Sequence, residues 1–173
     1  YFSGGPTTNF AHGSPGLEFS QPYLGIDQAS LHTFTLGREL FRANFAGDAL
    51  PGNGGNATGA DPDAAASACV DCHFQLGKAA PPGRGSQVQQ GFIHGGQDLR
   101  VAPPLIGLGL LEAVDASTIE QLARKSGGKV PDGRFGWKAT EPTIRDQIQK
   151  AFVLDIGVHN VSHAFVDRIE AYI

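Results

Sequence analysis

The pentapeptide Cys69-Val70-Asp71-Cys72-His73 contains the only two cysteines of this 173-residue chain. Two cysteines at this spacing, followed directly by histidine, form the CxxCH pattern by which c-type haem is attached. On one helical turn the two thiols can reach the two vinyl groups of a porphyrin, and the histidine can supply an imidazole to the iron. We therefore predict one covalent haem c, attached through Cys69 and Cys72, with His73 as the proximal iron ligand.

Three other interpretations of the two cysteines are a structural disulfide, a redox-active dithiol and half of a zinc site. A zinc site needs a second pair of ligands, and no downstream pair of histidines has the spacing of a zinc finger. A redox-active dithiol usually occurs in a βαβ setting, which this sequence does not indicate. We therefore prefer the haem interpretation.

The sequence does not identify the second axial ligand of the iron. The chain contains no methionine, so the Met/His pair of many cytochromes is excluded within this chain. A histidine, a weaker donor or an open sixth position remains. Among the histidines we favour His94 as a metal ligand, because the glycines of GFIHGGQ let the backbone approach a flat cofactor closely. The other histidines are His12, His32, His159 and His163.

The fold expected around this motif is mainly α, with long Gly/Pro-rich loops. Apolar residues recur at helical spacing, whereas no stretch alternates long enough for a convincing sheet. Glycine and proline together account for about one residue in five. Helices are expected at 27–45 with Asp27 as N-cap, at 117–125, at 141–156, and from about Ser162 onward.

We expect two regions in the chain. Residues 1–26 form an N-terminal extended arm, and residues 27–173 form a cytochrome c-like haem domain. A low-complexity insertion of Gly, Ala, Asp and Asn occupies 46–68, and residues 79–104 are expected to be mostly loop. The longest apolar stretch, at 101–114, contains two prolines and is too short to span a membrane.

Charge and composition limit the partners. The formal net charge is −4 and basic clusters are few, which argues against nucleic acid as a partner. The chain begins at Tyr1, and covalent attachment of haem requires reduced thiols and export-side machinery. We therefore expect a periplasmic or otherwise exported protein whose partner is a redox protein or other haem subunits.

Several segments carry a family resemblance. The segment GRELFRANF at 37–45 resembles the first helix of c-type cytochromes, in which a glycine and a Leu-Phe pair pack against the terminal helix. The chain as a whole resembles the bacterial di-haem oxidoreductases, also called thiol oxidoreductases, which are related to the di-haem cytochrome c peroxidases. The segments that carry this second resemblance are SGGPTT at 3–8, CVDCH at 69–73, LRVAPPLIGLGLLEAV at 99–114 and GRFGWKATEPTIRDQIQKAFVLDIGV at 133–158.

The resemblance implies roles for further cofactor-binding residues. Arg100 would lie near the haem propionates, where a guanidinium suits a pair of carboxylates. Pro104 and Leu105, together with Pro103, would pack beside the haem edge. Trp137 matches a position at which related enzymes relay electrons between haems; a buried core tryptophan is the alternative interpretation.

The chain departs from the family in having a single CxxCH pattern, because members typically carry a second one in a C-terminal domain. Our leading hypothesis is therefore a c-type cytochrome that transfers single electrons. The alternative is a subunit or fragment of a di-haem peroxidase-type oxidoreductase with an open haem iron, for which Glu112 and His94 are the candidate acid/base groups. A third hypothesis is an assembly subunit whose haem mainly stabilises the fold.

Overall fold

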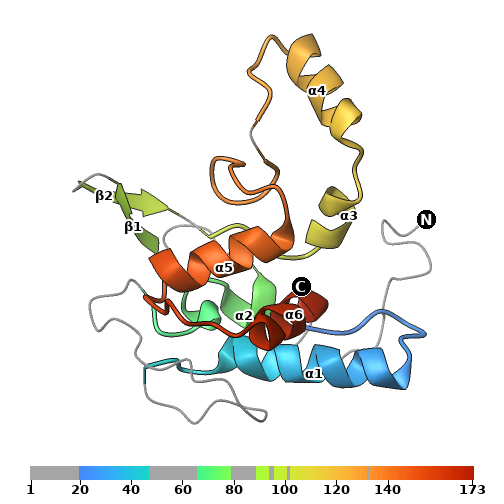
Figure 1. Ribbon diagram of the computed structural model, residues 1–173, viewed down its shortest axis with the longest axis vertical. Coiled ribbons are helices and arrows are strands. Elements are labelled where there is room, and N and C mark those ends of the chain that lie inside the picture. Colours follow the sequence, from blue (N-terminus) through green and yellow to red (C-terminus); the bar gives the residue numbers. More distant parts are fainter. Residues whose placement is uncertain (1–19, 47–65, 79–88, 94–95, 101, 132) are drawn as a thin grey trace.

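The computed structural model describes residues 20–46, 66–78, 89–93, 96–100, 102–131 and 133–173. Over these ranges the protein is mainly helical, as predicted (Figure 1). Most of the expected arm at 1–26 and most of the insertion at 46–68 lie outside the described residues, as do His12 and His94.

The longer helices agree with the sequence prediction to within a few residues. They are α1 (Gln28–Arg42), α4 (Ala116–Lys125), α5 (Ile144–Leu154) and α6 (His163–Tyr172). The Asp27 carboxylate accepts a hydrogen bond from the Ser30 amide at 2.9 Å, so Asp27 is the N-cap of α1 as expected. Ser162 caps α6 in the same way. Helix α5 begins later than predicted, because its N-cap is Thr143.

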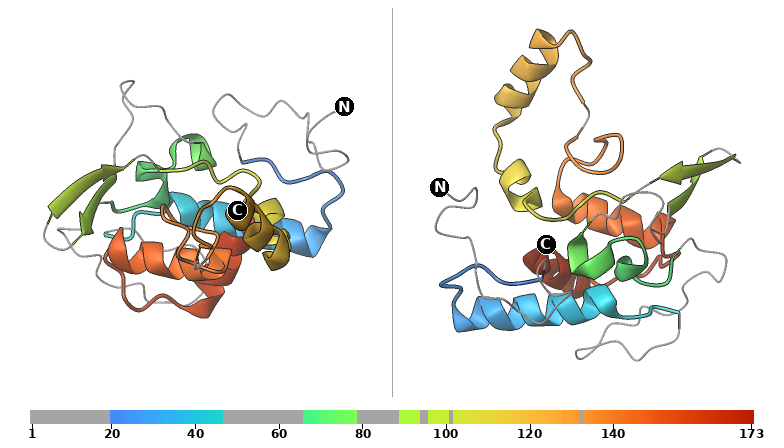
Figure 2. Two further views of the ribbon diagram at one scale, coloured as in Figure 1. Left: turned by 90° about the horizontal axis from the view of Figure 1, so that it is seen from above. Right: turned by 180° about the vertical axis from the view of Figure 1, so that it is seen from behind.

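The core is built on the contact between α1 and α6, which lie side by side (Figures 1 and 2). Gly37 lies so close to α6 that a Cβ atom placed there would be 1.9 Å from the Arg168 carbonyl oxygen. Around this contact the Tyr172 ring packs against Phe34 and Phe41, each with ring centroids 5.2 Å apart. The missing side chain of Gly37 therefore lets aromatic residues of both helices meet in one core.

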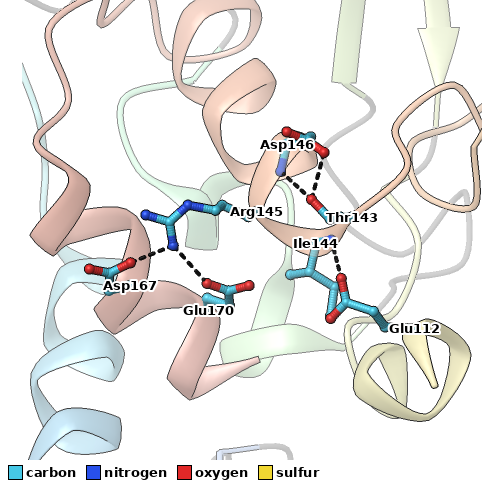
Figure 3. Close-up of polar contacts among 7 residues, drawn as sticks. All are labelled: Glu112, Thr143, Ile144, Arg145, Asp146, Asp167 and Glu170. Atoms are coloured by element: carbon cyan, nitrogen blue, oxygen red, sulfur yellow. Dashed lines mark hydrogen bonds and ion pairs between the residues drawn. The ribbon is translucent and has the colours of Figure 1, made fainter.

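Helix α5 also packs against α6, and polar contacts hold it there (Figure 3). The Arg145 guanidinium donates hydrogen bonds to Asp167 and Glu170 of α6. At the start of α5 the Ile144 amide donates to the Glu112 carboxylate at 3.0 Å. These contacts fix the face of α5 that carries Ile144 and Ile148, both of which are buried.

The prediction that residues 79–104 are mostly loop is wrong in part. Strands β1 (Gln89–Ile93) and β2 (Gly96–Arg100) form an antiparallel hairpin in which Ile93 pairs with Gly96. The strands themselves show no apolar-polar alternation, so periodicity did not reveal them.

Three short helices complete the described elements: η2 (Cys69–Asp71), α2 (Phe74–Gly77) and α3 (Leu108–Glu112). Helix α4 extends away from α1, α5 and α6 (Figure 1), whereas α3 contacts α5. Among the described residues, no helix has the length and apolar character needed to cross a membrane.

Candidate functional site

The CxxCH segment folds as a single helical turn, as its spacing predicted. The amides of Cys72 and His73 both donate to the Cys69 carbonyl oxygen, at 3.3 and 2.9 Å. The Asp71 carboxylate stabilises the start of the turn by accepting from the amides of Ser67 and Ala68, each at 2.9 Å. This turn brings both thiols and the imidazole to the wall of one cavity.

The orientation of the His73 ring is set by a residue thirty positions away. Its Nδ1 atom lies 3.0 Å from the Pro103 carbonyl oxygen. A carbonyl oxygen can only accept, so Nδ1 carries the proton and Nε2 keeps its lone pair. Burial lowers the pKa of His73 and so favours the neutral ring, although the hydrogen bond to Pro103 acts in the opposite direction. A neutral imidazole with a free Nε2 is the form that binds a metal ion.

The chain after the motif turns sharply to make this hydrogen bond possible. Gln75 and Leu76 have left-handed backbone angles, with φ of 48° and 61°. The Gly77 carbonyl oxygen then accepts from the Leu105 amide at 2.8 Å, which holds the 102–105 segment beside His73. Left-handed backbone at non-glycine residues is rare and concentrates at functional sites.

The cavity has a volume of about 90 Å³, is partly open to solvent, and is lined mainly by apolar side chains. Phe41 lines one wall and also packs against the His73 ring, with centroids 6.1 Å apart. Further apolar residues of the lining are Leu105, Leu108, Phe135, Ile144, Ile148, Ala151, Phe152, Ile156, Ile169 and Ile173.

Both thiols are unpaired and protonated at neutral pH. Burial, reinforced by the neighbouring Cys72, raises the pKa of Cys69 to about 12. Burial, reinforced by Asp155 and Asp71, raises the pKa of Cys72 to about 11. Thiols of redox-active CxxC motifs have lowered pKa values, so these two lack the electrostatic environment of such a motif.

Gln147 is the polar residue of the cavity wall that the sequence interpretation missed. Its Oε1 atom is buried and has no hydrogen-bond partner among the described residues. The close neighbour of this oxygen is Gly136, where a Cβ atom would lie 2.5 Å away. One feature of the sequence could have identified Gln147: it follows Ile144 by three residues, so both side chains lie on the same face of α5, the face toward the cavity.

The structure brings only some of the predicted cofactor-binding residues to the cavity. Leu105 lines it together with Cys69, Cys72 and His73. Pro104 is exposed and is not among the lining residues. Pro103 contributes its carbonyl oxygen, a role that the sequence did not indicate.

Trp137 does not line the cavity and is 59% exposed, with the Lys138 ammonium 5.4 Å from the centroid of its ring. From the same GRFGWKA segment it is Phe135 that lines the cavity. The Trp137 prediction, whether as cofactor contact or as buried core residue, therefore finds no support in its position.

The remaining candidates lie away from the cavity or outside the described positions. His32, His159 and His163 are exposed and are not lining residues. Arg100 ends β2, paired with Gln89, and its side chain falls outside what the structure describes. Glu112 caps the start of α5 through Ile144 and is not among the lining residues.

Comparison of the chain with protein-family models, with curated proteins and with solved structures finds no match to any of the three. Among the described residues, no three side chains of His, Cys, Asp or Glu come together as a group that could hold a metal ion. The arrangement itself offers two thiols and one imidazole nitrogen to the interior of an apolar cavity.

Proposed function

We propose that the protein is a c-type cytochrome that carries one covalent haem c and transfers single electrons outside the cytoplasmic membrane. The observation that carries this proposal is the placement of Cys69, Cys72 and His73 in the wall of one apolar cavity, with His73 Nδ1 bonded to the Pro103 carbonyl. Haem bound there would supply an iron that alternates between the ferric and ferrous states.

The residues present fit this cofactor. Cys69 and Cys72 would form the two thioether links, and Nε2 of His73 would bind the iron. The Pro103 carbonyl would hold the imidazole in orientation and increase its basicity. The apolar lining, including Phe41 and Phe152, would keep water from the porphyrin and so influence its reduction potential.

The competing interpretations explain less of the site. A redox-active dithiol needs a thiolate at neutral pH, whereas burial raises the pKa values of both cysteines. A structural disulfide would account for neither the cavity nor the orientation of His73. Haem accounts for the thiols, the imidazole and the apolar space together.

We also propose the cytochrome c-like fold and the family, the bacterial di-haem oxidoreductases. In support, Gly37 and Phe41 of the GRELFRANF segment pack against the terminal helix α6. The segment at 133–158 contributes Phe135, Ile144 and Phe152 to the cavity lining. Because haem is attached on the exported side of the membrane, the location that goes with this proposal is periplasmic or otherwise exported.

A second candidate function is that of a peroxidase-type enzyme subunit with an open haem iron. Gln147 favours it, because a buried acceptor with no partner costs about 1–3 kcal/mol unless a bound molecule satisfies it. An electron carrier does not need a polar group in this wall, whereas a site for a small oxygen-containing ligand does. A second haem would then have to come from a partner.

The experiment that tests both candidates is the visible spectrum of the protein made in a host able to attach haem c. We expect the α-band of haem c and a protein mass increased by one haem. The variants Cys69→Ala/Cys72→Ala should contain no covalent haem, while the control Ser67→Ala should keep it. A wild-type protein without haem bands would refute the proposal.

Cyanide added to the oxidised protein then separates the two candidates. A low-spin spectrum that cyanide leaves unchanged is expected for the electron carrier. A high-spin spectrum with rapid cyanide binding, altered in Gln147→Leu, would favour the enzyme instead.

A further inference from the structure

Asp155 differs in charge from the rest of the cavity wall. Among the described residues that line the cavity, it is the only Asp, Glu, Lys or Arg. Apart from the two thiols, the His73 ring and the uncharged amide of Gln147, the other lining side chains are apolar. Placing a charge beside an apolar space costs free energy, so a carboxylate at this position calls for an explanation.

The helix that carries Asp155 does not favour a carboxylate at this position. Asp155 is the C-cap of α5, and the negative end of a helix dipole disfavours a negative charge. Its amide donates to the Ala151 carbonyl oxygen at 2.9 Å, and its own carbonyl oxygen accepts from the Ala66 amide at 3.0 Å. Both contacts use backbone atoms only. They fix the position of residue 155 and do not require an acidic side chain.

The Asp155 carboxylate acts electrostatically on the CxxCH motif. Burial is the main cause of the raised pKa of Cys72, and the negative charge of Asp155 comes next. Burial and Cys72 raise the pKa of Cys69, and Asp155 adds a smaller effect in the same direction. Charges interact strongly in apolar surroundings, because little water is present to screen them. The charge of Asp155 therefore reaches the two sulfur atoms that would bond to the haem.

We propose that Asp155 lowers the reduction potential of the haem held in this cavity. Ferric haem carries one more positive charge than ferrous haem, so a nearby carboxylate stabilises the ferric state. The protein is then a better electron donor than the same apolar cavity would be without the carboxylate. This inference rests on the proposed haem function.

Two other features of the site also act on the potential. The apolar lining favours the less charged ferrous haem and raises the potential, whereas the Pro103 carbonyl makes His73 a stronger electron donor and lowers it. Neither feature depends on the side chain of Asp155. The substitution Asp155→Asn removes the charge and nearly preserves the shape, so it isolates the effect of the carboxylate.

The test is a redox titration of the haem-loaded protein, followed by its visible spectrum. In Asp155→Asn the ferrous-to-ferric ratio at a fixed ambient potential should rise by about three- to tenfold. This is an upward shift of about 30–60 mV in midpoint potential, at about 59 mV per tenfold change for one electron. An unchanged or lowered potential in this variant would overturn the proposal.

Two further variants control for net charge and for shape. Glu120→Gln makes the same charge change on α4, which extends away from α5 and α6 (Figure 1), and should change the ratio by less than twofold. Asp155→Glu keeps the charge and should have a potential closer to that of the wild type than to that of Asp155→Asn. If Glu120→Gln or Asp155→Glu shifts the potential as far as Asp155→Asn does, the position or the charge of Asp155 is not the cause and the proposal fails.

The haem content of each sample separates failure of this inference from failure of the proposed function. A wild-type protein without covalent haem refutes both. A wild-type protein with the spectrum of haem c, whose potential does not respond to Asp155→Asn, overturns the role of Asp155 alone.

Discussion

At the scale of single residues, Gly37 determines how closely α1 and α6 approach. A Cβ atom at this position would lie 1.9 Å from the Arg168 carbonyl oxygen and 2.9 Å from Tyr172 Cβ. Neither atom belongs to the end of a flexible side chain, so the two helices would have to separate. The same separation would disturb the Phe41–Tyr172 contact and, through Phe41, the packing around His73.

Gly37→Ala is therefore expected to lower the free energy of unfolding by about 1–3 kcal/mol or more, as overpacking does. This loss should exceed the gain of about 1 kcal/mol in helix propensity. Urea unfolding of both proteins measures the change. Gly109→Ala in α3 is the control, because nothing lies within 4 Å of the added Cβ, and it should not destabilise the protein. Equal stability of Gly37→Ala and wild type would contradict the close approach of the helices.

At the scale of elements, Tyr172 joins α6 to the segment after the CxxCH motif. Its hydroxyl donates to the Leu76 carbonyl oxygen at 2.5 Å in a buried position. Leu76 is one of the left-handed residues that turn the chain toward Gly77, and Gly77 holds Leu105 in place. The terminal helix thus supports the turn that positions Pro103 against His73.

Tyr172→Phe should remove this hydrogen bond and lower the free energy of unfolding by about 1–3 kcal/mol, because a buried carbonyl loses its partner. Hydrogen exchange at the Leu105 amide should also become faster, since its acceptor lies on the loosened segment. Tyr23→Phe is the matched control, because Tyr23 is 49% exposed, and it should change neither quantity. An unchanged exchange rate at Leu105 would show that α6 does not support the turn.

At the scale of the whole molecule, the cavity lies between α5, α6 and the CxxCH motif. It interrupts the packing of the hydrophobic core at this place. Its lining residues Phe152 and Ile169 belong to the same apolar cluster as Phe41 of α1. A group bound in this space adds contacts to every element of the core. Such a group binds the folded chain and not the unfolded one, so it raises the free energy of unfolding.

The proposed haem would be such a group, so its loss should affect the stability of the whole domain. For Cys69→Ser/Cys72→Ser we expect a Tm at least about 10 °C below that of the haem-loaded protein, at roughly 2–4 °C per kcal/mol for this size. Calorimetry of the two forms measures the difference. Ser67→Cys or Ser67→Ala, adjacent to the motif but outside the thiol pair, should retain the haem and most of the Tm. A haem-free protein with the wild-type Tm would mean that the cavity is not part of the cofactor site.

The longer helices and the turn of the CxxCH motif were accessible from the amino-acid sequence because both depend on neighbours in the chain. Asp27 and Ser162 cap helices through amides three residues away, and apolar periodicity marks the face of α5 with Ile144 and Ile148. The CxxCH pattern is contiguous, so its turn was predictable from spacing alone. The β1–β2 hairpin escaped prediction because its strands lack alternation.

The tertiary structure alone decided which distant groups complete the site. The partner of His73 is a backbone carbonyl at Pro103, and a carbonyl carries no residue-specific signal in the sequence. Phe135 rather than Trp137 reaches the cavity because the path of the loop determines which side chain points inward. Gln147 and Asp155 join the lining only once the helices are packed. These features depend on contacts between residues far apart in the chain, which local pattern does not encode.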